Sequence, residues 1–417
     1  MFLAFKGERF DGNDFCCNAI QNGIKSCLVS KLNEKTTSLA MEKNVDLIKV
    51  DDVSEAVIKI ATYIRSKINI PVIAITGSVG KTSTKDLISS VLSEKYTVHK
   101  TKGNMNNLIG LPLTILQLKN QQCLVTEMGM NHFGEISKLT NIAKPTLAVI
   151  TNIGTSHIGN LGSRENILKA KLEILEGLQG NTVIINNDND LLHKWYLENK
   201  EKYNIITIGI KEKESSYVAD NIISTEEKST FMLRTNDGRK QEVTIPIGGE
   251  HFILNSLCAI AVGDYYKISL EKIADGIEKT ELTRQRMEIT NAKNGATIIN
   301  DTYNANYDSM TAALKYLQNA KGKRKIAVLG DMLELGEYSK EYHKKIGKEI
   351  YNVDILITVG NEAKYISQNA NVKEKYHFDS NNEAVNKIRE IMQSNDIILV
   401  KASNSMKFID IVKEIVI

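Results

Sequence analysis

Residues 76–83 constrain the fold more strongly than any other stretch, because they read TGSVGKTS between an apolar run at 71–75 and a helical pattern at 84–92. A glycine-rich turn between a buried strand and a helix is the setting in which backbone amides and the positive end of the helix dipole bind phosphate. This order predicts an α/β domain that binds a nucleotide. The alternative is a glycine-rich turn with an incidental lysine, because Ile75 occupies the first glycine position of the longer form of the motif.

The residue types in this turn suit phosphate chemistry. Two glycines allow the backbone to curl so that its amides converge on phosphate oxygens. The lysine supplies a positive charge for the β- and γ-phosphates, and the threonine hydroxyl is placed to coordinate Mg²⁺. The candidate nucleotide-binding residues of the turn are Gly77, Ser78, Val79, Gly80, Lys81, Thr82 and Ser83.

Short apolar runs alternate with helical patterns after residue 70, which favours a parallel sheet covered on both faces. Residues 205–248 differ, because they are β-rich and contain Asn-Asp-Gly at 236–238, a hairpin signal. We expect a small antiparallel insertion or edge extension there, followed by helices at 253–265 and 270–279. The expected strands of the parallel sheet are 71–75, 123–125, 147–150 and 182–185, with helices at 84–92 and 164–178; the β-rich runs are 205–210, 230–234 and 242–247.

A second α/β series begins near Met287 and predicts a separate Rossmann-like domain. Its expected strands are 296–299, 326–329, 355–359 and 397–400. The basic run 321–325 is expected to be a solvated loop before a strand. Together with a small α/β piece at the start, these patterns predict three domains, at 1–68, 69–282 and 283–417, the last two joined by a linker at 281–286.

Composition excludes several classes of protein. The chain has 417 residues, with 53 Lys and Arg against 50 Asp and Glu, so the net charge of +3 argues against a general nucleic-acid binder. No uncharged apolar run is long enough to span a bilayer, and the first residues lack the apolar core of a secretory signal. Five cysteines without a C-x-x-C pair suggest reduced cytosolic thiols rather than disulfides or a zinc site.

Two further side chains follow predicted strands. Glu127 comes just after the strand at 123–125, and His157 comes after the strand at 147–150. If the sheet is parallel, both lie at the same edge as the phosphate loop, where they become candidate magnesium ligands with Thr82. Each alone is more simply an ordinary polar residue at a strand end.

Strings along the whole chain resemble the Mur ligase family, in the expected order. Within the family they are most similar to the ligases that add D-alanyl-D-alanine to UDP-N-acetylmuramoyl-tripeptide, and KGERFDGNDF at 6–15 resembles the uridine-side region. The other strings are TGSVGKTSTKD (76–86), TKGNMNNLIGLPLT (101–114), TEMGMNHFGEI (126–136), ITNIGTSHIGNLGSRENILKAKLEI (150–174), TRQRMEI (283–289), NDTYNANYDSM (300–310) and VLGDMLELGEYSKEYH (328–343).

The resemblance implies an ATP- and Mg²⁺-dependent ligase. A substrate carboxylate would attack the γ-phosphate to give an acyl phosphate, and the amine of the acceptor would then displace phosphate. The implied substrates are the small molecules UDP-N-acetylmuramoyl-tripeptide and D-alanyl-D-alanine. We therefore expect a cytoplasmic monomer that binds no nucleic acid and inserts into no membrane.

The resemblance also assigns roles to single residues. Arg286 resembles an arginine that reaches the γ-phosphate, Asn255 a residue near the adenine and Asp301 a ribose-binding aspartate. Lys171 falls where the family has a carbamylated lysine supporting a second magnesium, although spacing alone would make it a solvated helix lysine. Lys81, His157, Lys171 and Arg286 are thus the candidate catalytic residues. The candidate substrate-binding residues are Asn104, Asn106, Asn107, Asn304, Asn306 and Lys401, the first three forming an Asn-rich turn in the alternative interpretation.

The sequence departs from the family pattern at three places. Tyr307 stands where proline is usual, and Ala402 stands where glycine is usual. The chain also opens inside the uridine-side region, so the resemblance predicts an N-terminal domain that lacks its first part. Two alternatives remain open: another amino-acid ligase of the superfamily, such as a folylpolyglutamate synthase-like enzyme, or a nucleotide-binding partner without activity.

Overall fold

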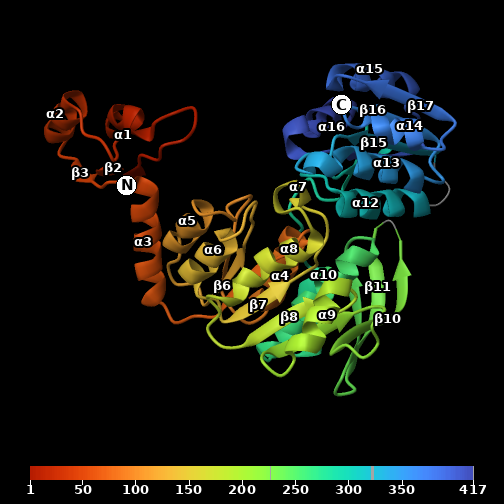
Figure 1. Cartoon of the computed structure of the whole chain (residues 1–417), viewed down its shortest axis with the longest axis horizontal. Helices are drawn as coiled ribbons and strands as arrows, with labels where there is room; N and C mark the ends of the chain where they lie inside the picture. The colour runs from red at the N-terminus through yellow and green to blue at the C-terminus, as the bar shows by residue number, and fades with distance from the viewer. Residues whose placement is uncertain (226, 321–323, 417) are drawn as a thin grey trace.

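A computed structural model describes residues 1–225, 227–320 and 324–416, which form three sheets that follow one another along the chain (Figure 1). The first sheet has the strand order β1-β2-β3, the second β12-β11-β10-β9-β8-β7-β4-β6-β5, and the third β13-β14-β18-β15-β16-β17. The predicted α/β class with a parallel central sheet is confirmed. The domain limits at 68/69 and 282/283 stay a proposal.

The first sheet is small and entirely parallel, and α3 connects it to the rest of the molecule (Figure 1). Near the end of α3, Arg65 is buried and donates from Nε to Ala143 O at 2.6 Å and from Nη2 to Lys144 O at 2.9 Å. These hydrogen bonds attach α3 to the end of α6, a helix of the part that carries the second sheet. The elements are β1 (Phe2–Leu3), β2 (Ser26–Val29), β3 (Asp46–Lys49), α1 (Cys16–Gln21), α2 (Glu34–Lys43) and α3 (Val53–Ser66).

The second sheet carries the phosphate loop on an interior strand, because β4 lies third from one edge and is flanked by β6 and β7, both parallel to it. All residues of these three strands are buried and most are apolar, as expected where helices cover both faces. The strands are β4 (Val72–Thr76), β5 (Val98–Lys100), β6 (Cys123–Glu127), β7 (Leu147–Ile150), β8 (Thr182–Asn186), β9 (Asn204–Gly209), β10 (Tyr217–Ser224), β11 (Ser229–Thr235) and β12 (Lys240–Ile245). The helices are α4 (Lys81–Ser93), α5 (Gly110–Leu116), α6 (Glu135–Ala143), α7 (Ile158–Leu161), α8 (Arg164–Leu172), α9 (Asp190–Asn199), α10 (Glu250–Tyr265) and α11 (Leu270–Glu278).

The β-rich segment 205–248 extends the edge of this same sheet, and one part of its prediction was wrong. The run at 205–210 forms β9, which pairs parallel with β8 rather than in an antiparallel insertion. Strand β10, which the sequence did not predict, pairs parallel with β9, and only β10, β11 and β12 are joined antiparallel. An alternating pattern reports which face of a strand is buried but not the direction of its neighbour.

The third sheet is parallel except for its edge strand β13, which pairs antiparallel with β14. Helices flank it (Figure 1). Strands β13 and β17 were not predicted from the sequence. The strands are β13 (Glu288–Asn291), β14 (Thr297–Asn300), β15 (Arg324–Gly330), β16 (Ile355–Val359), β17 (Glu374–Phe378) and β18 (Asp396–Lys401). The helices are α12 (Tyr307–Asn319), α13 (Ser339–Glu349), α14 (Lys364–Asn369), α15 (Asn381–Ile391) and α16 (Phe408–Val416).

The basic run 321–325 lies only partly in the described chain. Residues 321–323 are outside the described residues, and Arg324 and Lys325 begin β15. Lys325 is 5% exposed and its Nζ donates to Gln318 O at 2.8 Å, so the expectation of a solvated loop was wrong for these two residues. In the described ranges, no helix combines the length and the apolar character that crossing a bilayer requires.

Candidate active site

The loop between β4 and α4 depends on two glycines. Gly77 has a φ of 153° and Gly80 a φ of 83°, and Gly80 is the N-cap of α4. A Cβ at Gly77 would lie 1.9 Å from Thr151 Oγ1, and a Cβ at Gly80 would lie 2.6 Å from Asn255 Oδ1. Both positions therefore favour glycine for reasons of space as well as backbone conformation.

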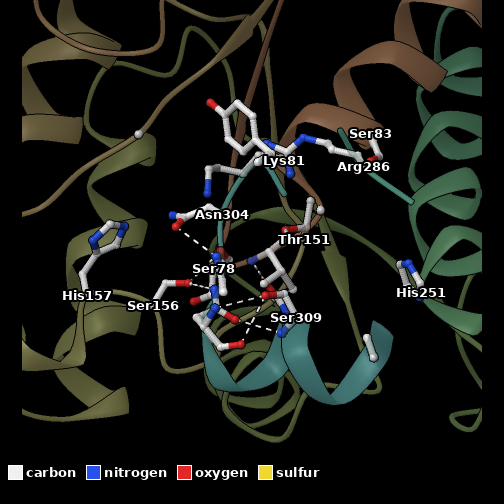
Figure 2. Close-up of a pocket in the computed structure, with 18 of the residues that line it drawn as sticks. Ser78, Lys81, Ser83, Thr151, Ser156, His157, His251, Arg286, Asn304 and Ser309 are labelled. Atoms are coloured by element: carbon white, nitrogen blue, oxygen red, sulfur yellow. Dashed lines mark hydrogen bonds between the residues drawn. The ribbon is translucent and has the colours of Figure 1, made fainter. Parts of the chain in front are cut away.

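The segment that follows β7 holds this loop in shape (Figure 2). Ser78 N donates to Asn152 O at 3.0 Å, and Val79 N donates to Asn152 Oδ1 at 2.9 Å. Thr151 Oγ1 donates to Val79 O at 2.6 Å, and Ser156 Oγ donates to Ser78 O at 2.9 Å. The loop is thus fixed at the carboxyl ends of parallel strands, where α/β proteins bind their ligands.

Lys81 is the first residue of α4, and its Nζ donates to Gly77 O at 2.8 Å. Burial lowers the pKa of Lys81; the carboxylate of Glu127 opposes this shift, and the guanidinium of Arg286 adds to it. A poorly hydrated ammonium group attracts an anion more strongly than a solvated one, because less water screens its charge.

Thr82 joins three distant parts of the chain. Its Oγ1 donates to Glu127 Oε2 at 2.9 Å and accepts from Arg286 Nη2 at 2.8 Å. Glu127 ends β6 and is 2% exposed, and its Oε1 accepts from Asn106 Nδ2 at 3.0 Å. A hydroxyl of the phosphate-loop helix, a carboxylate at a strand end and an arginine from the linker before the third sheet therefore meet at one point.

Arg286 lies in the connection between α11 and β13. Its guanidinium carbon is 4.0 Å from the centroid of the Tyr303 ring, a cation–π contact. Its Nε is buried and has no hydrogen-bond partner in the described chain. A buried donor without a partner is costly, so this atom is available to an acceptor that enters the cleft.

His157 and Glu334 approach each other from different sheets. His157 precedes α7 with a φ of 64°, and its Nδ1 lies 2.9 Å from Glu334 Oε2, an ion-pair distance without hydrogen-bond geometry. The imidazole lowers the pKa of Glu334, burial opposes this shift, and Lys81 adds to the lowering. A carboxylate that follows β15 thus reaches the side of the phosphate loop.

Lys171 is 1% exposed in α8, so the interpretation from spacing alone, a solvated helix lysine, was wrong. Burial lowers the pKa of Lys171 well below its usual value, and the charge of Lys81 adds to this effect. Among the described residues, Lys81 is the one charged neighbour that shifts the pKa of Lys171. The neutral amine favoured by these surroundings is the form that can add CO₂ to become a carbamate.

The donor set around Thr82 suits Mg²⁺. This ion prefers oxygen ligands at about 2.0–2.1 Å in octahedral geometry, which places neighbouring ligands roughly 2.9 Å apart. Thr82 Oγ1 and Glu127 Oε2 are 2.9 Å apart, and His157, whose Nδ1 lies 2.9 Å from Glu334 Oε2, lines the same cleft as Glu127. Within the described residues no three His, Cys, Asp or Glu side chains come together as a metal cage.

Asp301 and Lys401 form a largely buried ion pair. Lys401 Nζ lies 2.6 Å from Asp301 Oδ2 and donates to Asn304 O at 2.9 Å, while Asp301 Oδ1 accepts from Met287 N at 3.2 Å. The resemblance gave these two side chains separate roles, Asp301 on the ribose and Lys401 in substrate binding. In the structure they contact each other, so any ligand of one lies beside the other.

The remaining asparagines differ in their surroundings. Asn107 Oδ1 caps the start of α5, accepting two backbone amides at 3.1 and 2.9 Å. Asn306 is the N-cap of α12, and its Nδ2 donates to Ser156 Oγ beside the phosphate loop. Asn104 is exposed and, unlike the other candidate substrate-binding residues, does not line the cleft; Gly77, Thr82 and Lys171 also lie outside its lining.

The cleft between the second and third sheets has a cavity volume of about 350 Å³, which is within the range of small-molecule sites. Its walls bring together residues that are more than 300 positions apart in the sequence (Figure 2). Among the sequence-predicted residues that line it are Ser78, Lys81, Asn106, Glu127, His157, Asn255, Arg286, Asp301, Asn304 and Lys401.

Sequence reasoning gave no role to three residues that shape the cleft: Asn152, Tyr303 and Glu334. Glu334 follows the end of β15 as Glu127 ends β6, so the same strand-end argument could have found it. Asn152 holds the loop through its side chain, a contact for which the sequence carries no local signal.

Two family models match the chain. The Mur ligase middle domain matches residues 75–263, and the model described as Mur ligase, glutamate ligase domain matches residues 285–404. The first begins at the end of β4 and the second just before Arg286.

Relatives resemble the chain over nearly its full length. A UDP-N-acetylmuramoyl-tripeptide--D-alanyl-D-alanine ligase from Bacillus subtilis is 37% identical, with 100% of this chain and 90% of that protein covered. A protein of the same name from Escherichia coli is 31% identical, with 99% of this chain and 90% of that protein covered. Among solved structures, MurF from Acinetobacter baumannii has a TM-score of 0.89 at 30% identity, covering 100% and 90%. MurF ligase from Thermotoga maritima, in complex with ADP, has a TM-score of 0.86 at 26% identity, covering 99% and 93%.

Proposed function

Because the chain belongs to the Mur ligase family, we propose that it joins D-alanyl-D-alanine to UDP-N-acetylmuramoyl-tripeptide, converting ATP to ADP and phosphate. The product would be the pentapeptide precursor of peptidoglycan. Full-length similarity to ligases with this name supports the choice of substrates. The observation that carries the proposal is the meeting of Arg286 with Thr82 and Glu127 above the phosphate loop.

This arrangement suits phosphoryl transfer to a carboxylate. A carboxylate is a poor electrophile, and converting it to an acyl phosphate supplies a leaving group. Lys81 belongs to the phosphate loop and Arg286 reaches it from the linker before the third sheet, so the two cations would neutralise charge that builds up on the transferring phosphoryl group. The amine of the dipeptide then attacks the acyl carbon, and the tetrahedral intermediate collapses to the amide and phosphate.

Thr82, Glu127 and His157 would hold one Mg²⁺, and carbamylated Lys171 would support a second. Bound there, the metal neutralises phosphate charge and orients the transferring group. Asn106 and Thr82 hold the carboxylate of Glu127, and its backbone N–H donates a hydrogen bond to Thr101 Oγ1 at 3.1 Å. The protein therefore holds its carboxylate ligand rigid before the ion arrives.

Phosphate release tests this function. The purified protein should release phosphate from ATP only when UDP-N-acetylmuramoyl-tripeptide and D-alanyl-D-alanine are both present. Replacing both substrates with a reduced folate and L-glutamate separates this activity from that of a folylpolyglutamate synthase-like ligase. Release that ignores the dipeptide would refute the acceptor, and binding of ATP without any turnover would identify an inactive nucleotide-binding partner.

The same proposal includes location and assembly. ATP and nucleotide-linked sugars are cytoplasmic metabolites, so we expect the enzyme to act in the cytoplasm. We also expect the enzyme to be a monomer. Sedimentation at the concentrations used for activity would test the assembly.

A further inference from the structure

A buried carboxylate one turn beyond Thr82 links the phosphate-loop helix to the segment that carries Arg286. Asp86 is 2% exposed, and its Oδ2 accepts two hydrogen bonds from Thr283, from N at 3.0 Å and from Oγ1 at 2.7 Å. Thr283 lies 197 residues away in the sequence and three residues before Arg286. The two contacts therefore hold the linker against α4 just ahead of the arginine.

The distance between Thr82 and Asp86 on α4 suits the distance between Arg286 and Thr283 on the linker. Thr82 and Asp86 are four residues apart, so they lie on the same face of the helix, about 6 Å apart along its axis. One end of this face receives Arg286 at Thr82, and the other end receives Thr283. The segment 283–286 is thus attached to α4 at two successive points.

The linker would not keep this path without such contacts. Gln285 and Met287 both have left-handed backbones, with φ of 63° and 53°, which cost energy for residues other than glycine. From the side of the third sheet, Gln285 N donates to Glu288 Oε2 at 3.0 Å and Met287 N to Asp301 Oδ1 at 3.2 Å. Thr283 is the point at which the second sheet's α4 holds the same segment.

Two lysines keep the Asp86 carboxylate charged and directed. Lys100 Nζ donates to Asp86 Oδ1 at 2.8 Å, and Lys85 Nζ lies 3.6 Å from the same atom. Burial raises the pKa of Asp86, but these two cations and Thr283 lower it by more, so the net shift is downward. Both cations bind Oδ1, which leaves Oδ2 free to receive the two Thr283 donors.

We propose that Asp86 is a positioning residue, which holds Thr283 so that Arg286 reaches the γ-phosphate at the head of α4. Asp86 contacts no reacting atom and acts through the arginine. The inference rests on the proposed ligase function. It predicts that the Asp86–Thr283 contact affects turnover only while Arg286 is present.

A double-mutant cycle in the full-length protein tests this role. Thr283→Val keeps the size of the side chain and removes the hydroxyl donor to a charged acceptor, so kcat and kcat/KM for ATP should fall about tenfold together. Thr283→Ser should restore them. In an Arg286→Ala background, Thr283→Val should have no further effect, because the group that it positions is gone. An equal loss in both backgrounds, or no loss in either, would overturn the proposal.

Hydrogen exchange supplies a readout that does not need turnover. In Thr283→Val and Asp86→Asn, amides of 283–287 should exchange about tenfold faster, while those in the middle of α4 keep their protection. Unchanged exchange at 283–287 would overturn the proposal even if activity falls. A wild-type protein without dipeptide-dependent phosphate release would instead refute the ligase function, so the two failures are distinguishable.

Discussion

Lys81 and Lys171 are both poorly hydrated, but among the described residues only Lys81 has partners that favour its charged form. Lys81 retains an acceptor for its ammonium group in Gly77 O, and Glu127 favours its charge. Lys171 has no comparable compensation in the described chain, and Lys81 makes its charged form still less favourable. The first lysine is therefore suited to carry a charge to phosphate, and the second to lose its charge and be modified.

Replacing Lys81 by alanine should lower kcat by about a hundredfold or more, because a preorganised charge aimed at the transferring phosphoryl group is removed. Steady-state phosphate release with both substrates measures the loss. Lys138→Ala on α6 removes an exposed lysine of the same charge and serves as the control. Unchanged turnover in Lys81→Ala would contradict the assignment of the phosphate loop.

Replacing Lys171 by alanine should abolish most activity if the lysine carries a carbamate. A short carboxylic acid in the buffer should restore part of it, because it returns an oxygen ligand to the place of the carbamate. Lys169 is an exposed lysine on the same helix. The Lys169→Ala variant should keep wild-type activity, and the added acid should not change it. No loss in Lys171→Ala would remove this lysine from the site.

Lys171 should also make stability depend on pH. Because its folded pKa is lowered, the unfolded chain binds a proton that the folded chain lacks at pH values between that pKa and about 10.4. Stability of the wild type therefore rises with pH across this window. In buffer without CO₂, Lys171→Met should raise Tm near neutral pH, with a gain that disappears above pH ~10.4. A gain that is equal at all pH values would contradict a buried ionisable amine.

At the scale of elements, the sequence predicted best where burial is complete. The central strands β4, β6, β7 and β8 were predicted to within two residues, because each is a short apolar run between polar residues. Strand β17 was missed because it is an edge strand whose side chains are mostly exposed, so it lacks an apolar run. Pairing directions at the sheet edge also escaped prediction, since they depend on neighbours distant in sequence.

Local pattern placed part of the site, and packing determined the rest. The rule that parallel strands share a carboxyl edge puts Glu127 beside the phosphate loop, and Thr82 does contact it. The pairs His157–Glu334 and Asp301–Lys401 join residues from distant positions, and no local spacing indicates them. Burial of Lys171 was likewise invisible, because α8 has no strong apolar face to mark its inner side.

Alanine substitutions at Gly80 and Gly134 can separate the cost of a left-handed backbone from the cost of a steric clash. Gly80 and Gly134 are both N-caps, with φ of 83° and 80°, but a Cβ at Gly134 meets nothing within 4 Å. Each alanine substitution should therefore lose roughly 1–2 kcal/mol of stability from the left-handed backbone. Only Gly80→Ala should also weaken binding of an ATP analogue, because its Cβ displaces Asn255. Equal nucleotide affinities, measured by calorimetry, would contradict this role for Gly80.

At the scale of the whole molecule, the second and third sheets meet through contacts beside the phosphate loop. Asp308 Oδ2 in α12 accepts from Thr155 N at 2.6 Å and from Thr155 Oγ1 at 2.8 Å. Tyr338 OH donates to Gly162 O at 2.9 Å, and Gly159 N donates to Glu334 O at 3.2 Å. The part of the chain that carries the third sheet thus contacts the segment after β7, which borders the phosphate loop. We call the arrangement in which these contacts are made the closed conformation.

We expect nucleotide to shift the protein toward this closed conformation. The closed form pairs Arg286 with the loop while leaving its Nε without an acceptor, so bound phosphate should favour closure over any more open arrangement. X-ray scattering should show a smaller radius of gyration when a non-hydrolysable ATP analogue and Mg²⁺ are added. Asp308→Asn should need more analogue for the same compaction, because it weakens the contact with Thr155, whereas Asp410→Asn on exposed α16 surface should behave as the wild type. A radius that does not respond to nucleotide would show that the two sheets do not move relative to each other, and that Arg286 is in place before ATP binds.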